Sequence, residues 1–167
     1  MKYYAGLDVS LKEISICVVD REGTVFERGS APADAEGIAS WFKNRSLKPE
    51  KIVHESGQLS IWLQRGMVEI GLPAVCIDAC KAHKSLSARL NKSDSADAEG
   101  LAQLARTNWL TPVHIRSEVS DRLRTLIGAR ERLSRLRKDL EGHIRGMLKT
   151  FGIRMTGVGQ GSDQEPV

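Results

Sequence analysis

The sequence lacks long apolar runs, and none of its segments reaches the roughly 18 consecutive apolar residues that a membrane-spanning helix needs. Its N-terminus also lacks an apolar stretch behind a basic cluster, so we expect no signal peptide. Cysteine is scarce, with three in 167 residues, and an odd number fits a reducing compartment better than a disulfide scaffold. These absences predict a soluble, cytoplasmic protein with no membrane partner.

The composition also lacks the marks of a disordered chain, because 41% of the residues are hydrophobic and the net charge is only +4. The length is sufficient for one ordinary domain with a core and a further appendage. A mild positive charge is compatible with a nucleic-acid partner without requiring one.

The first 30 residues predict an antiparallel meander of three short strands joined by turns, at 3–9, 14–19 and 24–30. Helical and strand patterns then alternate, at 34–45, 51–56, 59–71, 73–79 and 93–106. Together they predict an α/β fold, a mixed sheet flanked by helices. Trp41 and Trp62 fall on apolar faces of two of these helices and are predicted core residues.

A long helical run is predicted from about 118 to 151, with apolar residues that step mostly by three and four. This spacing resembles a coiled-coil stripe and predicts self-association, as a homodimer or higher oligomer. Residues 116–154 hold eleven Lys or Arg and five acids. The excess predicts contacts with phosphates, whereas the alternative is a solvated face with pairs such as Glu131–Arg135. The predicted nucleic-acid-binding residues here are Arg130, Arg132, Arg135, Arg137 and Lys138.

Two acids interrupt or end apolar strands. Asp8 lies within the first predicted strand, on the opposite side from Ala5 and Leu7, although it could instead cap a turn at a frayed strand end. Glu55 ends the apolar strand that contains Ile52, and ligands of open α/β sheets collect outside such strand ends. An ordinary solvated glutamate is the alternative for Glu55.

A second pair of acids leads a helix. Asp94, Asp97, Leu101 and Leu104 follow i, i+3, i+7 and i+10 and therefore share one face, which the leucines mark as inward. Helix capping explains one aspartate well and the second only in part. If all four acids converge, a hard divalent cation is needed to keep them ionised side by side. We therefore predict two Mg²⁺ ions, which Mn²⁺ can replace, held by Asp8, Glu55, Asp94 and Asp97.

The motifs "GLDVS" (6–10), "HES" (54–56) and "KSDSADAEGLA" (92–102) resemble those of the DEDD transposases of bacterial insertion sequences, insertion sequence family 110. The resemblance covers residues 1–155 and includes the order Asp, Glu, Asp, Asp and the long helix. It implies a ribonuclease-H-like (RuvC-like) catalytic domain at 1–115, followed by the basic coiled-coil segment at 116–154. The glycine-rich, polar composition of residues 155–167 predicts a disordered tail.

The resemblance further implies a bacterial, cytoplasmic DNA transposase that cleaves and transfers phosphodiester strands with Mg²⁺ and is guided by a structured RNA. Family members continue into a C-terminal domain with a serine nucleophile, so this chain is expected to be a truncated reading frame or a fragment. Ser162 is not assigned that role. The basic stretch 81–92 either holds nucleic acid near the acids or is a solvated loop; its predicted contacts are Lys84, Arg89 and Lys92.

Two alternatives remain open at this point. The chain could be a catalytically inactive nucleic-acid-binding or dimerisation module left by truncation. It could also be part of an actin-like or sugar-kinase ATPase, since "GLDVS" also occurs there, although 167 residues cannot hold the second lobe of a full kinase.

Overall fold

The structure, a computed structural model, describes residues 1–86 and 94–155, without the side chains of residues 85, 86 and 94–96. The predicted contacts Arg89 and Lys92, and nearly all of the predicted tail, lie outside this part of the chain. The chain divides into two compact units, Met1–Ile115 and Arg116–Val167, and each is described by itself.

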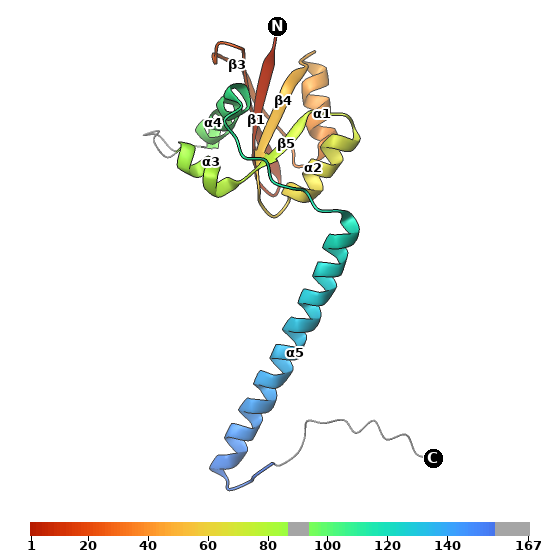
Figure 1. The fold of residues 1–167 in the computed structure, drawn as a ribbon, viewed down its shortest axis with the longest axis vertical. Helices are drawn as coiled ribbons and strands as arrows, with labels where there is room; N and C mark the ends of the chain where they lie inside the picture. The colour runs from red at the N-terminus through yellow and green to blue at the C-terminus, as the bar shows by residue number, and fades with distance from the viewer. Residues whose placement is uncertain (87–93, 156–167) are drawn as a thin grey trace, which may run out of the picture. The chain divides into compact units, whose positions relative to one another are not determined.

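The first unit is built on a five-stranded mixed sheet in the order β3-β2-β1-β4-β5 (Figure 1). The strands are β1 (Tyr3–Val9), β2 (Glu13–Val19), β3 (Val25–Pro32), β4 (Pro49–Glu55) and β5 (Ala74–Ile77). The first three form an antiparallel meander, and β4 and β5 run parallel to β1. Together with its flanking helices and the long helix that follows, this sheet confirms the predicted α/β fold, a mixed sheet flanked by helices.

Helices cover both faces of the sheet (Figure 1). One face packs against α1 (Ala35–Asn44) and α2 (Ser60–Glu69), and the other against α3 (Ala79–Leu86) and α4 (Asp94–Thr107). Local sequence sets several ends: the Asp34 carboxylate accepts the Gly37 N–H at 2.6 Å at the start of α1. After α2, Gly71 adopts a φ of 81°, which a side chain would oppose.

Helix α3 was not predicted, because residues 73–79 were interpreted as one strand and the basic stretch after it as a loop. Strand β5 ends at Ile77, and the carboxylate of Asp78 accepts the N–H of Lys81 at 2.9 Å. Asp78 therefore caps a helix instead of ending a strand. Lys84 lies on this helix and is exposed.

Side-chain alternation along β1 is as predicted. Ala5 and Leu7 are fully buried in the core that the sheet forms with α1 and α2. Gly6 faces α4, where a Cβ atom added to it would lie only 2.1 Å from the Ala98 carbonyl oxygen and 2.3 Å from the Ala102 nitrogen. Strand β1 and helix α4 are thus in backbone-to-backbone contact, which glycine alone permits.

The two predicted core tryptophans differ. Trp41 of α1 is buried, but Trp62 of α2 is 57% exposed, so that prediction was wrong. Helix α2 turns Leu63 and Met67 toward the sheet, and Trp62 lies outside that stripe.

The second unit contains α5 (Glu118–Thr150), a single helix of 33 residues whose start is capped by Ser117. None of its residues is buried, and the apolar row that includes Leu126, Leu133 and Leu140 is exposed. Ion pairs Glu118–Arg122 at 2.6 Å and Arg137–Glu141 at 3.5 Å join successive turns. In the described part of the chain, none of the helices combines the length and apolarity needed to cross a membrane.

Candidate active site

Asp8 lies inside β1, where it pairs in register with Ser15 of β2. It is therefore not the frayed strand end that the capping alternative required. Because side chains alternate along a strand, Asp8 shares the α4 face with Gly6, two residues earlier. Its side chain is half-buried there.

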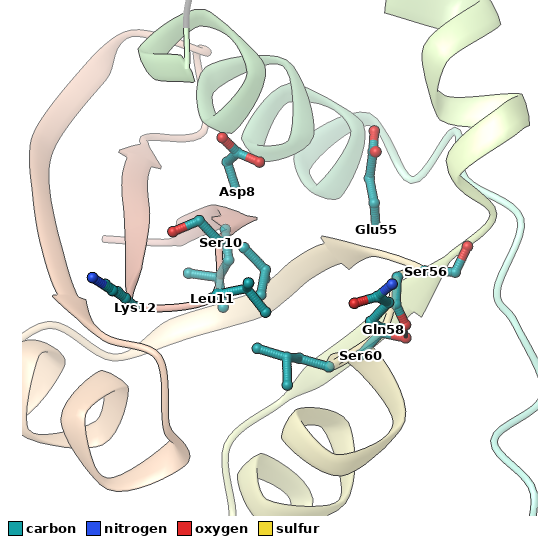
Figure 2. Close-up of a pocket in the computed structure, with 12 residues that line it drawn as sticks. Asp8, Ser10, Leu11, Lys12, Glu55, Ser56, Gln58 and Ser60 are labelled. Atoms are coloured by element: carbon teal, nitrogen blue, oxygen red, sulfur yellow. Dashed lines mark hydrogen bonds between the residues drawn. The ribbon is translucent and has the colours of Figure 1, made fainter.

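Glu55 is the last residue of β4, the strand that runs parallel to β1. The final paired residues are Leu7 and His54, so the next position along each strand places Asp8 and Glu55 side by side. Figure 2 shows both carboxylates pointing to the same side of the sheet, toward α4. The half-buried Glu55 is thus not an ordinary solvated glutamate.

The electrostatics of Glu55 reveal a third acid. Burial raises the pKa of Glu55 above its ordinary value of 4.5, and the negative charges of Asp8 and Asp97 raise it further. His83 of α3 acts in the opposite direction. Asp8 of β1 and Asp97 of α4 therefore both lie close enough to Glu55 of β4 to act on its charge.

Asp97 lies on the inward face of α4, as its spacing from Leu101 and Leu104 predicted. Leu101 and Leu104 are buried against the sheet, and Asp97 is half-buried. Ala98, the next residue, is one of those that meet Gly6, so the close approach of α4 to β1 holds Asp97 on the side of the sheet that Asp8 faces. Asp94 is the first residue of α4, but its side chain lies outside the described residues.

The donor chemistry of these acids fits a hard divalent cation, because all their ligand atoms are carboxylate oxygens and their repulsion is what a cation would relieve. Their spacing is not that of a closed metal site: among the described side chains, no three from His, Cys, Asp and Glu are close enough to hold one ion.

An open cleft of about 640 Å³ adjoins Asp8 and Glu55. Its other walls are the turn after β1, with Ser10 and Lys12, and the loop after β4, with Gln58 (Figure 2). The sequence did not single out Lys12 or Gln58, and it did not predict that His83 lies near Glu55. For His83 the missed signal was the helix cap at Asp78, which fixes where α3 begins.

The predicted nucleic-acid contacts are distributed over both units. Lys84 lies on α3, and the five basic residues of the second unit lie on α5 and are all exposed. Arg137 is paired with Glu141. Their role in binding stays a prediction.

Comparisons with known proteins agree with the motifs. Residues 5–153 match the profile of the DEDD transposase family of IS110, described as "Transposase". The chain is 26% identical over 152 residues to the transposase for insertion sequence element IS1111A of Coxiella burnetii (strain RSA 493 / Nine Mile phase I). That alignment covers 90% of this chain but 40% of the relative, so this chain spans less than half of the relative's length.

Two solved structures are similar in fold at 15% sequence identity. T. thermophilus RuvC in complex with Holliday junction substrate has a TM-score of 0.47 and covers 68% of this chain and 100% of its own. The Thermus thermophilus RuvC structure has a TM-score of 0.46, with 66% and 99% covered. Since the family profile extends over residues 5–153 of 167, the chain belongs to the IS110 family of transposases.

Proposed function

We propose that this chain is the metal-dependent nuclease part of a DNA transposase, which cleaves and transfers phosphodiester strands when an insertion sequence moves. The supporting observation is that Asp8, Glu55 and Asp97 come together from three separate elements on one face of the sheet. Family membership supports the transposase role, whereas the four-acid site and its substrate belong to the proposal.

Asp8, Glu55, Asp94 and Asp97 would hold divalent cations, with Mg²⁺ as the expected ion and Mn²⁺ as a substitute. When bound, such ions activate the attacking oxygen and stabilise the leaving oxygen of a phosphodiester. The chain's own contribution is to present several carboxylates on a rigid strand-and-helix frame. The raised pKa of Glu55 means that a cation must compete with a proton there, so binding strengthens as pH rises.

The expected partners are DNA and a structured guide RNA in the bacterial cytoplasm. Lys84, Arg89 and Lys92 in the first unit would contact nucleic acid close to the acids. Arg130, Arg132, Arg135, Arg137 and Lys138 on α5 would bind phosphates, and the exposed apolar row of the same helix would pair two or more copies.

Calorimetric titration of the 167-residue chain with Mg²⁺ and Mn²⁺ tests the metal site. Asp8→Asn should abolish or strongly weaken metal binding. It removes one carboxylate charge from a group of acids that does not form a complete metal site without the ion. The matched control is Glu69→Gln, an exposed acid on α2, which should bind as the wild type does. Equally negligible binding in wild type and Asp8→Asn would reject the site.

A second candidate function is a catalytically inactive nucleic-acid-binding or dimerisation module, which the exposed basic residues and the exposed apolar row of α5 favour. It predicts salt-sensitive binding of DNA or RNA that survives Asp8→Asn and Glu55→Gln. The triple change of Arg132, Arg135 and Arg137 to Ala should weaken that binding. Metal-dependent cleavage of DNA by the wild-type chain would rule this candidate out.

A further inference from the structure

A small pocket lies on the α3 and α4 side of the sheet, outside the cleft at Asp8. Its volume is about 230 Å³, below the roughly 300–1,000 Å³ of typical small-ligand sites, and suited to one flat ring. The floor is apolar, with Ile77, Ala82 and Leu104. We call it the Trp109 pocket, after the indole that forms part of its wall.

Trp109 is 79% exposed, an unusual position for the largest aromatic side chain. Its segment is held in place on both sides. Before it, Asn108 reverses the chain after α4 with a φ of 56° and accepts a hydrogen bond from Lys51. After it, the Thr111 carbonyl accepts the Asp78 N–H at 3.2 Å, and the Val113 N–H donates to the Cys76 carbonyl at 2.9 Å. The indole is therefore displayed by a fixed segment along the edge of β5.

Two lysines line the same pocket. Lys81 and Lys84 are three residues apart on α3 and therefore lie on one face of that helix, and both are exposed. Asp78 also lines the pocket, but its carboxylate accepts the Lys81 N–H and so caps α3. The wall thus combines an exposed aromatic face with two cations, as in proteins that stack bases and track the backbone of single strands.

The pocket also lies beside the proposed catalytic edge. Ile77, in its floor, pairs in register with Glu55 across β4 and β5. Helix α3 contributes to both the catalytic edge and the Trp109 pocket. His83 lies near enough to Glu55 to affect its charge, and Lys81 and Lys84 line the pocket. A strand whose phosphate reaches Glu55 would therefore pass along α3 toward Trp109.

From this juxtaposition we infer that the Trp109 pocket binds one unpaired base of single-stranded DNA that flanks the cleaved phosphate, stacked on the indole, with its backbone phosphates on Lys81 and Lys84. The inference deepens the proposed function, but base stacking needs neither the carboxylates nor a metal. All binding measurements are therefore made without divalent ions, so that the metal site does not contribute to them. A failure here is thus separate from a failure of the metal titration.

The test uses the full 167-residue chain in a Trp62→Phe background, because Trp62 is the other exposed tryptophan and Trp41 is buried. Single-stranded DNA should quench the fluorescence of Trp109 and protect it from acrylamide. Trp109→Leu should weaken DNA binding by about 5- to 150-fold, the range expected for one stacked base, and Trp109→Phe should restore most of it. DNA with an abasic nucleotide in place of the stacked base should lose as much affinity as Trp109→Leu does. Combining the abasic DNA with Trp109→Leu should cause no further loss of affinity.

The lysines are tested by salt dependence. Changing Lys81 and Lys84 together to Gln should reduce the slope of log affinity against log salt by about 1.4, or about 0.7 for each phosphate contact. The matched control Lys48→Gln, an exposed lysine outside the pocket, should leave the slope unchanged.

Three results would overturn the inference. One is DNA affinity that is unchanged by Trp109→Leu. Another is quenching by RNA of the same sequence but not by DNA. The third is a change in self-association, without any change in DNA binding, when Trp109 is replaced, which would make the pocket a protein contact.

Discussion

The two faces of the sheet are packed differently. The face against α1 and α2 is filled with large side chains, including Leu7, Ile38 and Phe42. The face against α4 also buries Leu101 and Leu104, but where the helix crosses β1 the contact is made by small residues, with Gly6 opposite Ala98 and Ala102. Large side chains hold a helix away from a sheet, whereas small ones let the two backbones meet.

The polar groups follow the same division. On the α1/α2 face the fully buried His54 faces Gln64, whose carbonyl oxygen lies 2.8 Å from Nε2, and the Gln64 amide donates to the Ala74 carbonyl at 2.7 Å. Burial lowers the pKa of His54, so the imidazole stays neutral. On the α4 face, by contrast, the negative charges of Asp8 and Asp97 lie near Glu55 and raise its pKa. The polar groups of the α1/α2 face are therefore paired by hydrogen bonds, whereas Glu55 on the α4 face lies near acids of its own charge.

The largest expected effect comes from removing the small-residue contact. Gly6→Ala should lower the free energy of unfolding by about 3 kcal/mol or more, because its Cβ atom would meet backbone atoms of α4 that cannot rotate away. Urea unfolding measures the loss. Gly57→Ala, where an added Cβ meets nothing within 4 Å, is the control and should change stability by less than about 0.5 kcal/mol. A Gly6→Ala protein as stable as the control would contradict the close packing of α4.

An intermediate effect is expected on the opposite face. Gln64→Leu should cost about 1–3 kcal/mol, because it leaves His54 and the Ala74 carbonyl without their partner. His54→Leu combined with Gln64→Leu should lose less than the sum of the single changes, since both remove the same bond. Gln58→Leu, at an exposed glutamine, serves as the control. Strict additivity in this double-mutant cycle would show that the two side chains do not interact.

The smallest effect concerns pH. The pKa of Glu55 is raised on folding, so the folded chain binds this proton more tightly than the unfolded chain does. The contribution of Glu55 to stability is then greatest below the ordinary value of 4.5 and falls as pH rises through the folded-state pKa. Glu55→Gln should remove this fall and stabilise the metal-free chain at neutral pH by up to about 1 kcal/mol.

The check is a comparison of unfolding free energies across acidic to neutral pH for wild type, Glu55→Gln and Glu69→Gln. Only Glu55→Gln should flatten the profile. If Asp8→Asn leaves the titration of Glu55 unchanged, the two carboxylates do not sense each other.

Much of the difference between the two faces of the sheet was predictable, because it depends on the spacing of residues within single strands and helices. A period of two in β1 places Gly6 and Asp8 on one side, and a helical period in α4 places Asp97 with Leu101 and Leu104. Helix α3 was missed because Asp78 could end a strand or begin a helix, and only its bond to Lys81 distinguishes these. Trp62 was misplaced because its helix has more apolar positions than the sheet can cover.

By itself, the sequence determined the order of the strands and of the helices other than α3, the inward sides of β1 and α4, and the family motifs, because these depend on residues a few positions apart. The tertiary structure decided that β4 pairs with β1, that α4 lies directly on Gly6, and that Trp109 stands beside the lysines of α3. These contacts join residues far apart in the chain. They depend on which surfaces fit when the core closes, and no local period encodes that fit.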